Sequence, residues 1–387
     1  MTAPPRLRVS LDASAVPSAP VGAGRYTIEL VGALTARDDV DLTIWARKGD
    51  GERWRGPSRL VMAQAPEHRP TRLVWEQARL PALLSRATPP PDVHHGPHYT
   101  MPERARLPQV VTIHDMTFFD HPGWHERAKV PVFRRAITVA ARRASSLVCD
   151  SQATADRFEE RCRPAGRVFV VPLGVDRARF TDREPSPGHD AAVLATLGVH
   201  GSYVLFLGTI EPRKGVAQLV AAFDRLAPSR TEPTLVLAGA MGWGTEDVER
   251  ALTTSPNLER IVRLGYVPDE VVPSLLRHAA VVAYPSIEEG FGLPAIEALA
   301  CGAPLVTTTG TAMAEVVGTA ALLVSAGGVD ELAEAIAAAL DAGPDAAERR
   351  RRGLEVAARH TWAASASGHL DAYRWAVEVG GSGRRGR

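Results

Sequence analysis

The sequence predicts an α/β protein made of two doubly wound parallel sheets. Short apolar runs alternate with amphipathic stretches of helical period along most of the 387 residues, which is the pattern of parallel strands joined by helices. The pattern stops at a proline-containing segment, residues 183–188, and then restarts. The length also exceeds what one hydrophobic core usually holds, so two domains are expected.

The elements can be assigned in order from these runs. Strands are expected at residues 7–12, 41–45, 59–63, 93–96, 109–115, 146–150 and 168–171, and then at 203–208, 235–239, 261–267, 281–284, 304–308 and 321–324. Helices are expected at 26–36, 72–85, 127–143, 329–340, 344–360 and 362–379, among others. Ser151 and Asp269 are each placed to cap a helix, the second of which ends at His278.

These elements divide the chain into five parts. We expect an N-terminal Rossmann-like domain at 1–184, a linker at 185–200 and a second Rossmann-like domain at 201–361. A helix at 362–379 is expected to cross back to the first domain. The tail, 380–387, consists of glycine, serine and arginine and is expected to be disordered.

Composition and charge exclude several classes of function. The net charge of +1 leaves no overall basic surface for nucleic acid. No run approaches the roughly 20 apolar residues of a membrane span, and the first residues have no apolar signal core, so a cytoplasmic location is expected. The three cysteines are far apart and form neither a zinc pattern nor a disulfide framework.

The most informative stretch is 285–302, which follows the strand at 281–284. Gly290 and Gly292 allow the backbone to approach a ligand closely, and the helix that begins near Pro294 offers its positive end to an anion. Glu289 in the loop and Glu297 on the helix can accept the hydroxyls of a sugar and a ribose. Together these features predict a nucleotide-sugar site, although acids near a helix start also stabilise the helix alone.

Arg213 and Lys214 stand in the loop after the strand at 203–208, which ends at Gly208. Arginine can bind two phosphate oxygens and lysine adds a compact charge, so this pair predicts a diphosphate site. A solvated basic pair is the alternative. No paired acidic cluster for Mg²⁺ accompanies the pair, so no metal is predicted and the two cations are expected to replace it.

Two further loops lie at strand ends in the first half. Gly22 and Gly24 separate a strand from a helix, as in phosphate-binding turns, but the third glycine and the acidic residue of a dinucleotide site are missing. This argues against a dehydrogenase. His114 ends the strand at 109–115 and is expected to face a ligand, with a loop hydrogen bond as the alternative.

Two other groups of residues have a structural and a functional interpretation. His94, His95 and His98 could bind a metal, but no cysteine or carboxylate set completes the site. The arginine-rich stretch 127–143 could lie on an anionic membrane, although a domain helix with a solvated basic face is favoured.

The stretch 289–297 resembles the Glu-x7-Glu motif of retaining GT-B glycosyltransferases of family 4, also called glycosyl transferases group 1. Other segments resemble the same family: 211–215, 22–26, 112–115, 172–176, 315–318 and 362–373. The resemblance covers nearly the whole chain and is greatest to mannosyltransferases of polysaccharide synthesis. It implies a GT-B fold, in which two Rossmann-like domains face a central cleft.

The resemblance also implies a role for each matching residue. Arg213 and Lys214 bind the donor diphosphate, Glu297 the ribose and Glu289 the transferred sugar. His114 lies by that sugar, and the resemblance thus gives four catalytic residues: His114, Glu289, Arg213 and Lys214. The donor-binding set is Gly22, Gly24, Gly208, Arg213, Lys214, Gly265, Tyr266, Val267, Glu289, Gly290, Phe291, Gly292, Leu293 and Glu297.

The expected reaction is transfer of a hexose, with mannose the first choice, to a hydroxyl of a glycan, lipid-linked or small-molecule acceptor. The configuration is expected to be retained. The co-substrate is a nucleotide sugar, GDP-mannose or a UDP-hexose, and no other cofactor is expected. Peripheral association with the inner face of a membrane stays open. The alternatives are a nucleotide-sugar 2-epimerase-like isomerase or hydrolase, and a non-catalytic nucleotide-sugar binding protein.

Overall fold

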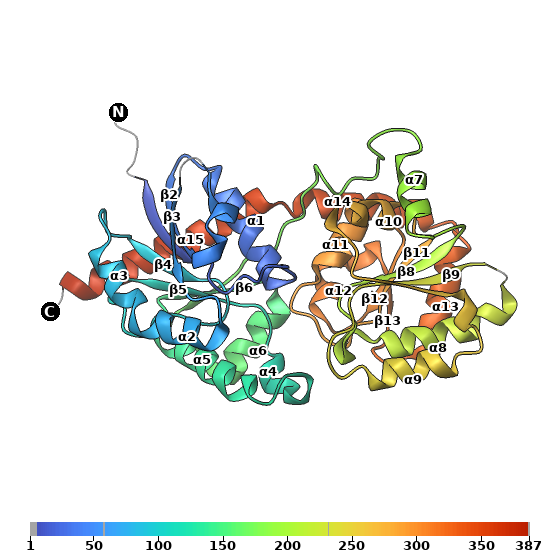
Figure 1. Ribbon diagram of the computed structural model, residues 1–387, viewed down its shortest axis with the longest axis horizontal. Coiled ribbons are helices and arrows are strands. Elements are labelled where there is room, and N and C mark those ends of the chain that lie inside the picture. The colour runs from blue at the N-terminus through green and yellow to red at the C-terminus, as the bar shows by residue number, and fades with distance from the viewer. Residues whose placement is uncertain (1–5, 57–58, 231, 386–387) are drawn as a thin grey trace. The chain divides into compact units, whose positions relative to one another are not determined.

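The computed structural model describes residues 6–56, 59–230 and 232–385 and divides the chain into two compact units. Unit 1 comprises Met1–Leu173 and Trp362–Arg387, and unit 2 comprises Gly174–Thr361. Each is a parallel sheet with helices on both faces, so the predicted fold class is confirmed (Figure 1).

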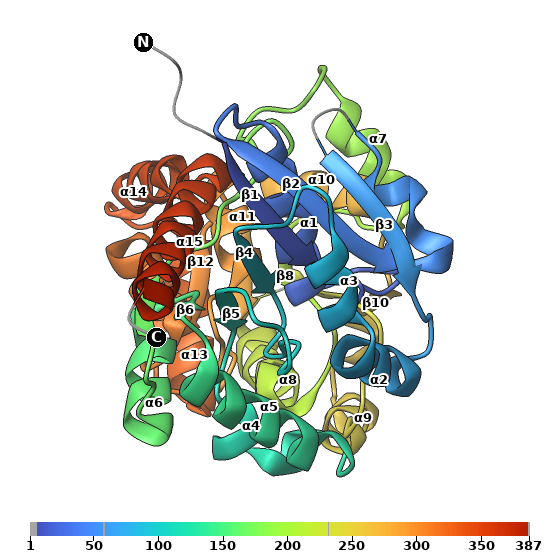
Figure 2. The same ribbon diagram turned by 90° about the vertical axis from the view of Figure 1, so that its left-hand side faces the viewer.

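Unit 1 holds a seven-stranded sheet in the order β3-β2-β1-β4-β5-β6-β7, in which every pairing is parallel. The strands are β1 (Leu7–Asp12), β2 (Val40–Arg47), β3 (Arg59–Ala65), β4 (Val93–Gly96), β5 (Gln109–Ile113), β6 (Ser146–Cys149) and β7 (Arg167–Val170). The helices are α1 (Ala23–Thr35), α2 (Arg69–Ala78), α3 (Leu80–Arg86), α4 (Thr117–Asp120), α5 (Lys129–Arg143), α6 (Gln152–Cys162) and α15 (Trp362–Arg385). Within this unit, α15 lies beside β6 (Figure 2).

Unit 2 holds a six-stranded parallel sheet in the order β10-β9-β8-β11-β12-β13. Its strands are β8 (Tyr203–Leu207), β9 (Thr234–Ala238), β10 (Ile261–Gly265), β11 (Val281–Tyr284), β12 (Leu305–Thr308) and β13 (Leu322–Val324). Its helices are α7 (His189–Thr196), α8 (Val216–Leu226), α9 (Glu246–Thr254), α10 (Val272–His278), α11 (Leu293–Ala300), α12 (Ala312–Val317), α13 (Val329–Leu340) and α14 (Ala346–Arg359). In Figure 1, α8, α9 and α13 lie on one side of this sheet and α10, α11 and α14 on the other.

The strand order explains where the functional loops come together. From β8 the chain continues to β9 and β10 on one side of the sheet, and from β11 it continues to β12 and β13 on the other side. The loops after the two central strands, β8 and β11, therefore meet at the carboxyl edge of the sheet. Ligands of open α/β sheets bind at such a reversal of strand order. The loop with Arg213 and Lys214 follows β8, and the stretch with Glu289 follows β11. In unit 1 the reversal lies between β1 and β4.

Two helix boundaries differ from the sequence-based expectation and a third agrees with it. The helix expected at 72–85 is two helices, broken at Arg79, because the ring of Pro81 cannot continue an α-helix. Asp269 does not cap α10 but lies in the short 3-10 turn η7 (Asp269–Val271) that precedes it. Ser151 caps α6 as expected, since its Oγ accepts a hydrogen bond from the Thr154 amide at 3.1 Å.

The parts expected to be linker and tail are also more ordered than their composition suggested. Residues 189–196 of the expected linker form α7, and unit 2 begins earlier, at Gly174. The last helix, α15, continues to Arg385, whereas a disordered tail was expected from Gly380. The last two residues of that tail lie outside the described residues.

Basic α5 is a domain helix. It buries Phe133 and Ile137 in the core of unit 1, and several of its arginines bind groups of the same unit. Arg135 forms an ion pair with Glu103, and Arg143 donates to the carbonyl oxygen of Glu103. Within the described parts of the chain, no helix has the length and apolar character required to span a bilayer.

The C-terminal helix α15 is joined to the sheet of unit 1 through buried polar groups. His369 on α15 is fully buried, and its Nδ1 lies 2.8 Å from the carbonyl oxygen of Ser365. A carbonyl only accepts, so Nδ1 carries the proton and the neutral ring accepts at Nε2. The Tyr26 hydroxyl lies 2.7 Å from this Nε2 and donates to it.

This first hydrogen bond sets the direction of the next three. Tyr26 donates to His369, so its oxygen accepts from Thr112, at 2.8 Å. Thr112 in turn accepts from Nε2 of His95, at 2.8 Å, and Nδ1 of His95 accepts from the Tyr373 hydroxyl, at 2.8 Å. Every group is satisfied only while both histidines are neutral. Their partners are thus protein groups, which gives His95 no part in the metal site considered above.

We expect acid to weaken unit 1 through His369. Burial lowers the pKa of His369 to about 4 from 6.5, so the unfolded chain binds more protons than the folded one between these two values. The contribution of His369 to the free energy of unfolding is therefore fully present above about pH 6.5. It is lost as the pH decreases towards 4, and the loss amounts to about 3 kcal/mol. Denaturant unfolding between pH 7 and 5 measures the slope of the free energy of unfolding against pH, and His369→Gln should show a shallower slope than the wild type. Parallel slopes would contradict the assignment.

Candidate active site

The loop after β8 carries the predicted phosphate-binding cations. Gly208 follows the last residue of β8, and the 3-10 turn η4 (Pro212–Lys214) leads through Gly215 into α8. Gly215 has a φ of 67°, and a Cβ there would lie 2.2 Å from the carbonyl oxygen of Pro285. Only glycine therefore allows this loop to lie directly against the stretch after β11.

Arg213, Lys214 and Glu289 meet where these two loops touch. Nη1 of Arg213 lies 2.8 Å from Oε2 of Glu289, and Nζ of Lys214 pairs with Oε1 of the same carboxylate. Ser286 donates to Oε1 as well, at 3.0 Å. The structure thus brings together three of the four residues that the resemblance implied to be catalytic.

The charges of this cluster shift its pKa values. Although burial raises it, the neighbouring charges of Arg213 and Lys214 lower the pKa of Glu289 to about 2, so it is ionised at neutral pH. Burial and the charge of Arg213 lower the pKa of Lys214, while Glu289 opposes that shift. The cluster therefore has two cations that are partly removed from water, where they interact more strongly with an anion.

Two helix starts point towards the same edge of the sheet. Gly215 and Gly292, both with positive φ, precede α8 and α11, and no described side chain caps either helix. Their first amides and dipoles can therefore stabilise phosphate oxygens. Glu297 lies in the second turn of α11 and is 7% exposed.

Glycines also lie at the carboxyl ends of the three neighbouring strands β8, β9 and β10. The Gly239 amide donates to the carbonyl oxygen of Gly265 at 2.7 Å, and the Gly208 amide donates to that of Ala238 at 2.8 Å. Tyr266, next to Gly265, is 63% exposed, whereas Val267 is buried. An exposed aromatic ring beside close-packed backbone is suited to stacking on a nucleobase.

Gly239 was not singled out from the sequence, but the structure leaves no room for another residue there. A Cβ would lie 1.9 Å from the carbonyl oxygen of Gly208, and the φ of Gly239 is 153°. We expect Gly239→Ala to cost about 1–3 kcal/mol in the free energy of unfolding and to weaken nucleotide binding. Gly343→Ala, where a Cβ meets nothing within 4 Å, is the control. Equal unfolding midpoints for the two variants would contradict this prediction.

The backbone around the other predicted residues is also tightly fixed. Gly292 has a φ of 96°, and a Cβ there would lie 2.2 Å from Cγ of Met313. Phe291 is buried, with its ring centroid 6.0 Å from that of His360, so it offers a ligand its backbone and not its ring. Gly290 lies between Glu289 and Phe291, and Leu293 is the first residue of α11.

In unit 1 the predicted residues are Gly22, Gly24 and His114. Gly22 has a φ of 47° and precedes α1, and a Cβ there would meet nothing within 4 Å, so its surroundings are open. Gly24 is packed, since a Cβ would lie 3.2 Å from Cβ of Pro20. His114 follows β5 and is 8% exposed.

His114 is held from both ring nitrogens. Its Nδ1 lies 2.6 Å from Oδ2 of Asp150, and its Nε2 donates to the carbonyl oxygen of Pro97 at 2.8 Å. Burial opposes it, but the Asp150 carboxylate raises the pKa of His114 above its usual value. The histidine therefore ties the loop after β4 to the ends of β5 and β6.

Sequence reasoning missed Asp150 and Glu211 as site residues. Asp150 follows β6, which pairs with β5, so the rule that selected His114 applies to it equally. Glu211 lies 4% exposed in the same loop as Arg213, and its Oε1 is 2.5 Å from Nε of that arginine. Their signal was a polar residue at a strand end.

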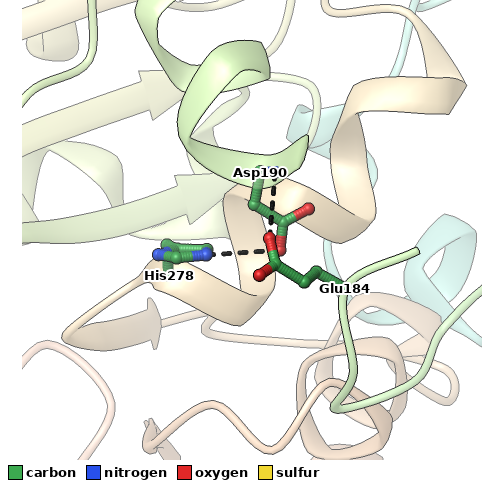
Figure 3. A group of neighbouring side chains, drawn as sticks. All are labelled: Glu184, Asp190 and His278. Carbon is green, nitrogen blue, oxygen red and sulfur yellow. Dashed lines mark hydrogen bonds and ion pairs between the residues drawn. The ribbon is translucent and has the colours of Figure 1, made fainter. Parts of the chain in front are cut away.

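Among the described residues, one group has the spacing of metal ligands: Glu184, Asp190 and His278 (Figure 3). Both carboxylate oxygens of Asp190 already accept from Arg277, at 2.7 Å each. Glu184 accepts from the Asp190 amide at 3.3 Å. A metal ion here would stand beside a guanidinium, so we interpret the group as the anchor of α7. Asp190 also explains why this part of the expected linker belongs to unit 2.

Comparison with known proteins agrees with this geometry. The sequence model described as Glycosyltransferase Family 4 matches residues 20–179, and the one described as Glycosyl transferases group 1 matches residues 199–356. The chain is 31% identical over 285 residues to the O-antigen chain mannosyltransferase B of Escherichia coli. The aligned region covers 73% of this chain and 74% of the relative. The chain therefore belongs to glycosyltransferase family 4 and is a glycosyltransferase.

Solved structures show the same fold. The sucrose-phosphate synthase of Thermosynechococcus elongatus superposes with a TM-score of 0.77 at 21% identity, covering 95% of this chain and 98% of that one. Anabaena Alr3699/HepE in complex with UDP-glucose gives a TM-score of 0.73 at 20% identity, covering 95% of this chain and 100% of that one. These similarities show the GT-B fold.

Proposed function

We propose that this glycosyltransferase transfers a hexose from a nucleoside-diphosphate sugar to a hydroxyl of a glycan, lipid-linked or small-molecule acceptor, with retention of configuration and without a metal. The main observation in support is the partly buried cluster of Arg213, Lys214 and Glu289 at the reversal point of the unit 2 sheet. It combines cations for a diphosphate with a carboxylate that can accept sugar hydroxyls.

The proposed reaction is a front-face displacement. The bond between the anomeric carbon and the diphosphate oxygen breaks, and the acceptor oxygen bonds to that carbon from the same side. The departing diphosphate oxygen takes the acceptor's proton. Arg213 and Lys214 stabilise the charge that develops on the diphosphate, which is the role of a metal ion in other transferases. Glu297 binds the ribose, and His114 keeps the role beside the transferred sugar that the resemblance gives it.

The donor proposed first is GDP-mannose, with UDP-hexoses second. The similarity to a mannosyltransferase supports the first, and the fold shared with a UDP-glucose complex supports the second. Tyr266 contributes by stacking on the base in either case. A thermal-shift screen against GDP-, UDP- and ADP-sugars separates them, because a ligand at 100 times its Kd adds about 2.7 kcal/mol of stability.

Incubating the selected donor with and without acceptors then tests the reaction. The proposal predicts a glycoside of unchanged anomeric configuration, and release of the nucleoside diphosphate that depends on the acceptor. An epimerised donor without acceptor would support the isomerase instead. Binding without turnover across a panel of glycan and lipid-linked acceptors would support a nucleotide-sugar binding protein.

A further inference from the structure

The two phosphate-binding cations of unit 2 already have counterions of their own. Arg213 pairs with Glu211 through Nε and with Glu289 through Nη1, and Lys214 pairs with Glu289. Two positive charges thus face two carboxylates. Both carboxylates are less than a tenth exposed, with Glu211 at 4% and Glu289 at 9%, so water screens these pairs weakly.

Glu289 therefore cannot pair with the two cations and bind the transferred sugar at the same time. The proposed function needs Arg213 and Lys214 for the diphosphate and Glu289 for hydroxyls of the transferred sugar. A carboxylate whose two oxygens pair with these cations competes with phosphate oxygens for the same N–H donors. Its Oε1 also accepts from Ser286 at 3.0 Å, which leaves it little capacity for a sugar hydroxyl.

We propose that Glu289 is a displaceable counterion: it holds Arg213 and Lys214 until the diphosphate of the donor replaces it, and the displaced carboxylate then binds the sugar. This inference rests on the proposed function and deepens it. The same event would place the diphosphate on its cations and make Glu289 available to the hexose. A nucleotide without a sugar would displace Glu289 but give the carboxylate no new partner.

Glu211 is the fixed member of this arrangement. It binds Arg213 at Nε, on the edge of the guanidinium that Glu289 does not use. When Glu289 leaves Nη1, Glu211 still orients the guanidinium, so a phosphate meets a preorganised donor. Glu211 is thus a positioning residue for the diphosphate, and it never needs to contact the donor itself.

The test is titration calorimetry of UDP, GDP and inorganic pyrophosphate into the wild-type protein and Glu289→Gln. The exchange predicts that the variant binds the preferred nucleoside diphosphate and pyrophosphate roughly tenfold more tightly, because no charged hydrogen bond has to be broken first. Turnover should fall in the same variant because the sugar loses its carboxylate. Glu246→Gln removes an exposed carboxylate from the first turn of α9 and should change neither quantity.

A second measurement covers the case in which Glu289→Gln folds poorly. The variant leaves two partly buried cations with one carboxylate fewer, so pyrophosphate should raise its unfolding midpoint more than that of the wild type. Glu289→Asp keeps the charge on a shorter side chain and should bind the nucleotide with an affinity between those of the wild type and the Gln variant.

The outcomes distinguish the exchange, in which the diphosphate displaces Glu289 from Arg213 and Lys214, from the proposed function. Nucleotide binding to the wild type, with equal or weaker binding to Glu289→Gln, would overturn the exchange and leave the proposed function standing. If neither UDP nor GDP bound the wild type, the proposed function would fail and the exchange with it. A Glu289→Gln variant that binds the nucleotide more tightly and still transfers sugar at the wild-type rate would show that Glu289 does not bind the transferred sugar.

Discussion

Arg213→Ala and Lys214→Ala should each reduce turnover of the donor by roughly 10²-fold or more, which corresponds to about 2.7 kcal/mol in the activation barrier. Both cations lie in the loop after β8, and both contact Glu289 where the loops after β8 and β11 meet. They are also largely removed from water, with side chains 24% and 15% exposed. A charge that stabilises the departing diphosphate acts mainly in the transition state, so kcat should fall more than KM rises.

The assay follows release of the nucleoside diphosphate with the preferred donor and acceptor. Arg225→Ala is a matched control, because Arg225 forms its ion pair with Asp330 on the surface of the same unit. It should retain full turnover. Near wild-type rates for both Arg213→Ala and Lys214→Ala would remove the basis of the mechanism. Folding of each variant is checked by its unfolding midpoint.

Arg277→Ala should be the most destabilising of the simple truncations in unit 2, at about 3–5 kcal/mol. Asp190 is fully buried on α7, and Arg277 on α10 binds both of its carboxylate oxygens at 2.7 Å. Burial raises the pKa of Asp190, but Arg277 and Ser274 together lower it below its usual value, so the carboxylate is ionised. Without the guanidinium, a buried charge loses its main partner, while Ser274 and His278 remain beside it.

Chemical denaturation measures this loss. Arg225→Ala again serves as the control, since exposed pairs contribute only about 0–1 kcal/mol. The double variant Asp190→Asn, Arg277→Ala should recover part of the loss, because it removes the unpaired charge as well. A single Arg277→Ala that stays within about 1 kcal/mol of the wild type would show that α7 is not anchored by this ion pair.

The fold was largely predictable because most strands inside the two sheets are buried on both faces. Residues 7–12 and 329–340, for example, form a strand and a helix at the expected bounds. In unit 2 the candidate site followed from the order of strands and loops, since Arg213, Lys214 and Glu289 lie at strand ends that a doubly wound sheet brings together.

What the sequence did not predict depends on contacts between distant residues. Tyr26 and His369 are hydrogen-bonded across 343 positions, and no local pattern indicates that pairing. Asp190 sits in a stretch with the composition of a linker, and only its contact with Arg277 makes that stretch part of unit 2. Glu211 is adjacent to the predicted cations, but its ion pair with Arg213 depends on side-chain conformation.

The most direct test of the central claim is binding of the nucleoside diphosphate itself, measured by calorimetry in the presence of EDTA. GDP or UDP should bind the wild-type protein without a divalent metal. Arg213→Ala and Lys214→Ala should weaken this binding strongly, whereas Arg225→Ala should not. Nucleotide binding that requires a metal ion, or that is unchanged in both variants, would contradict the claim that these two cations bind the diphosphate.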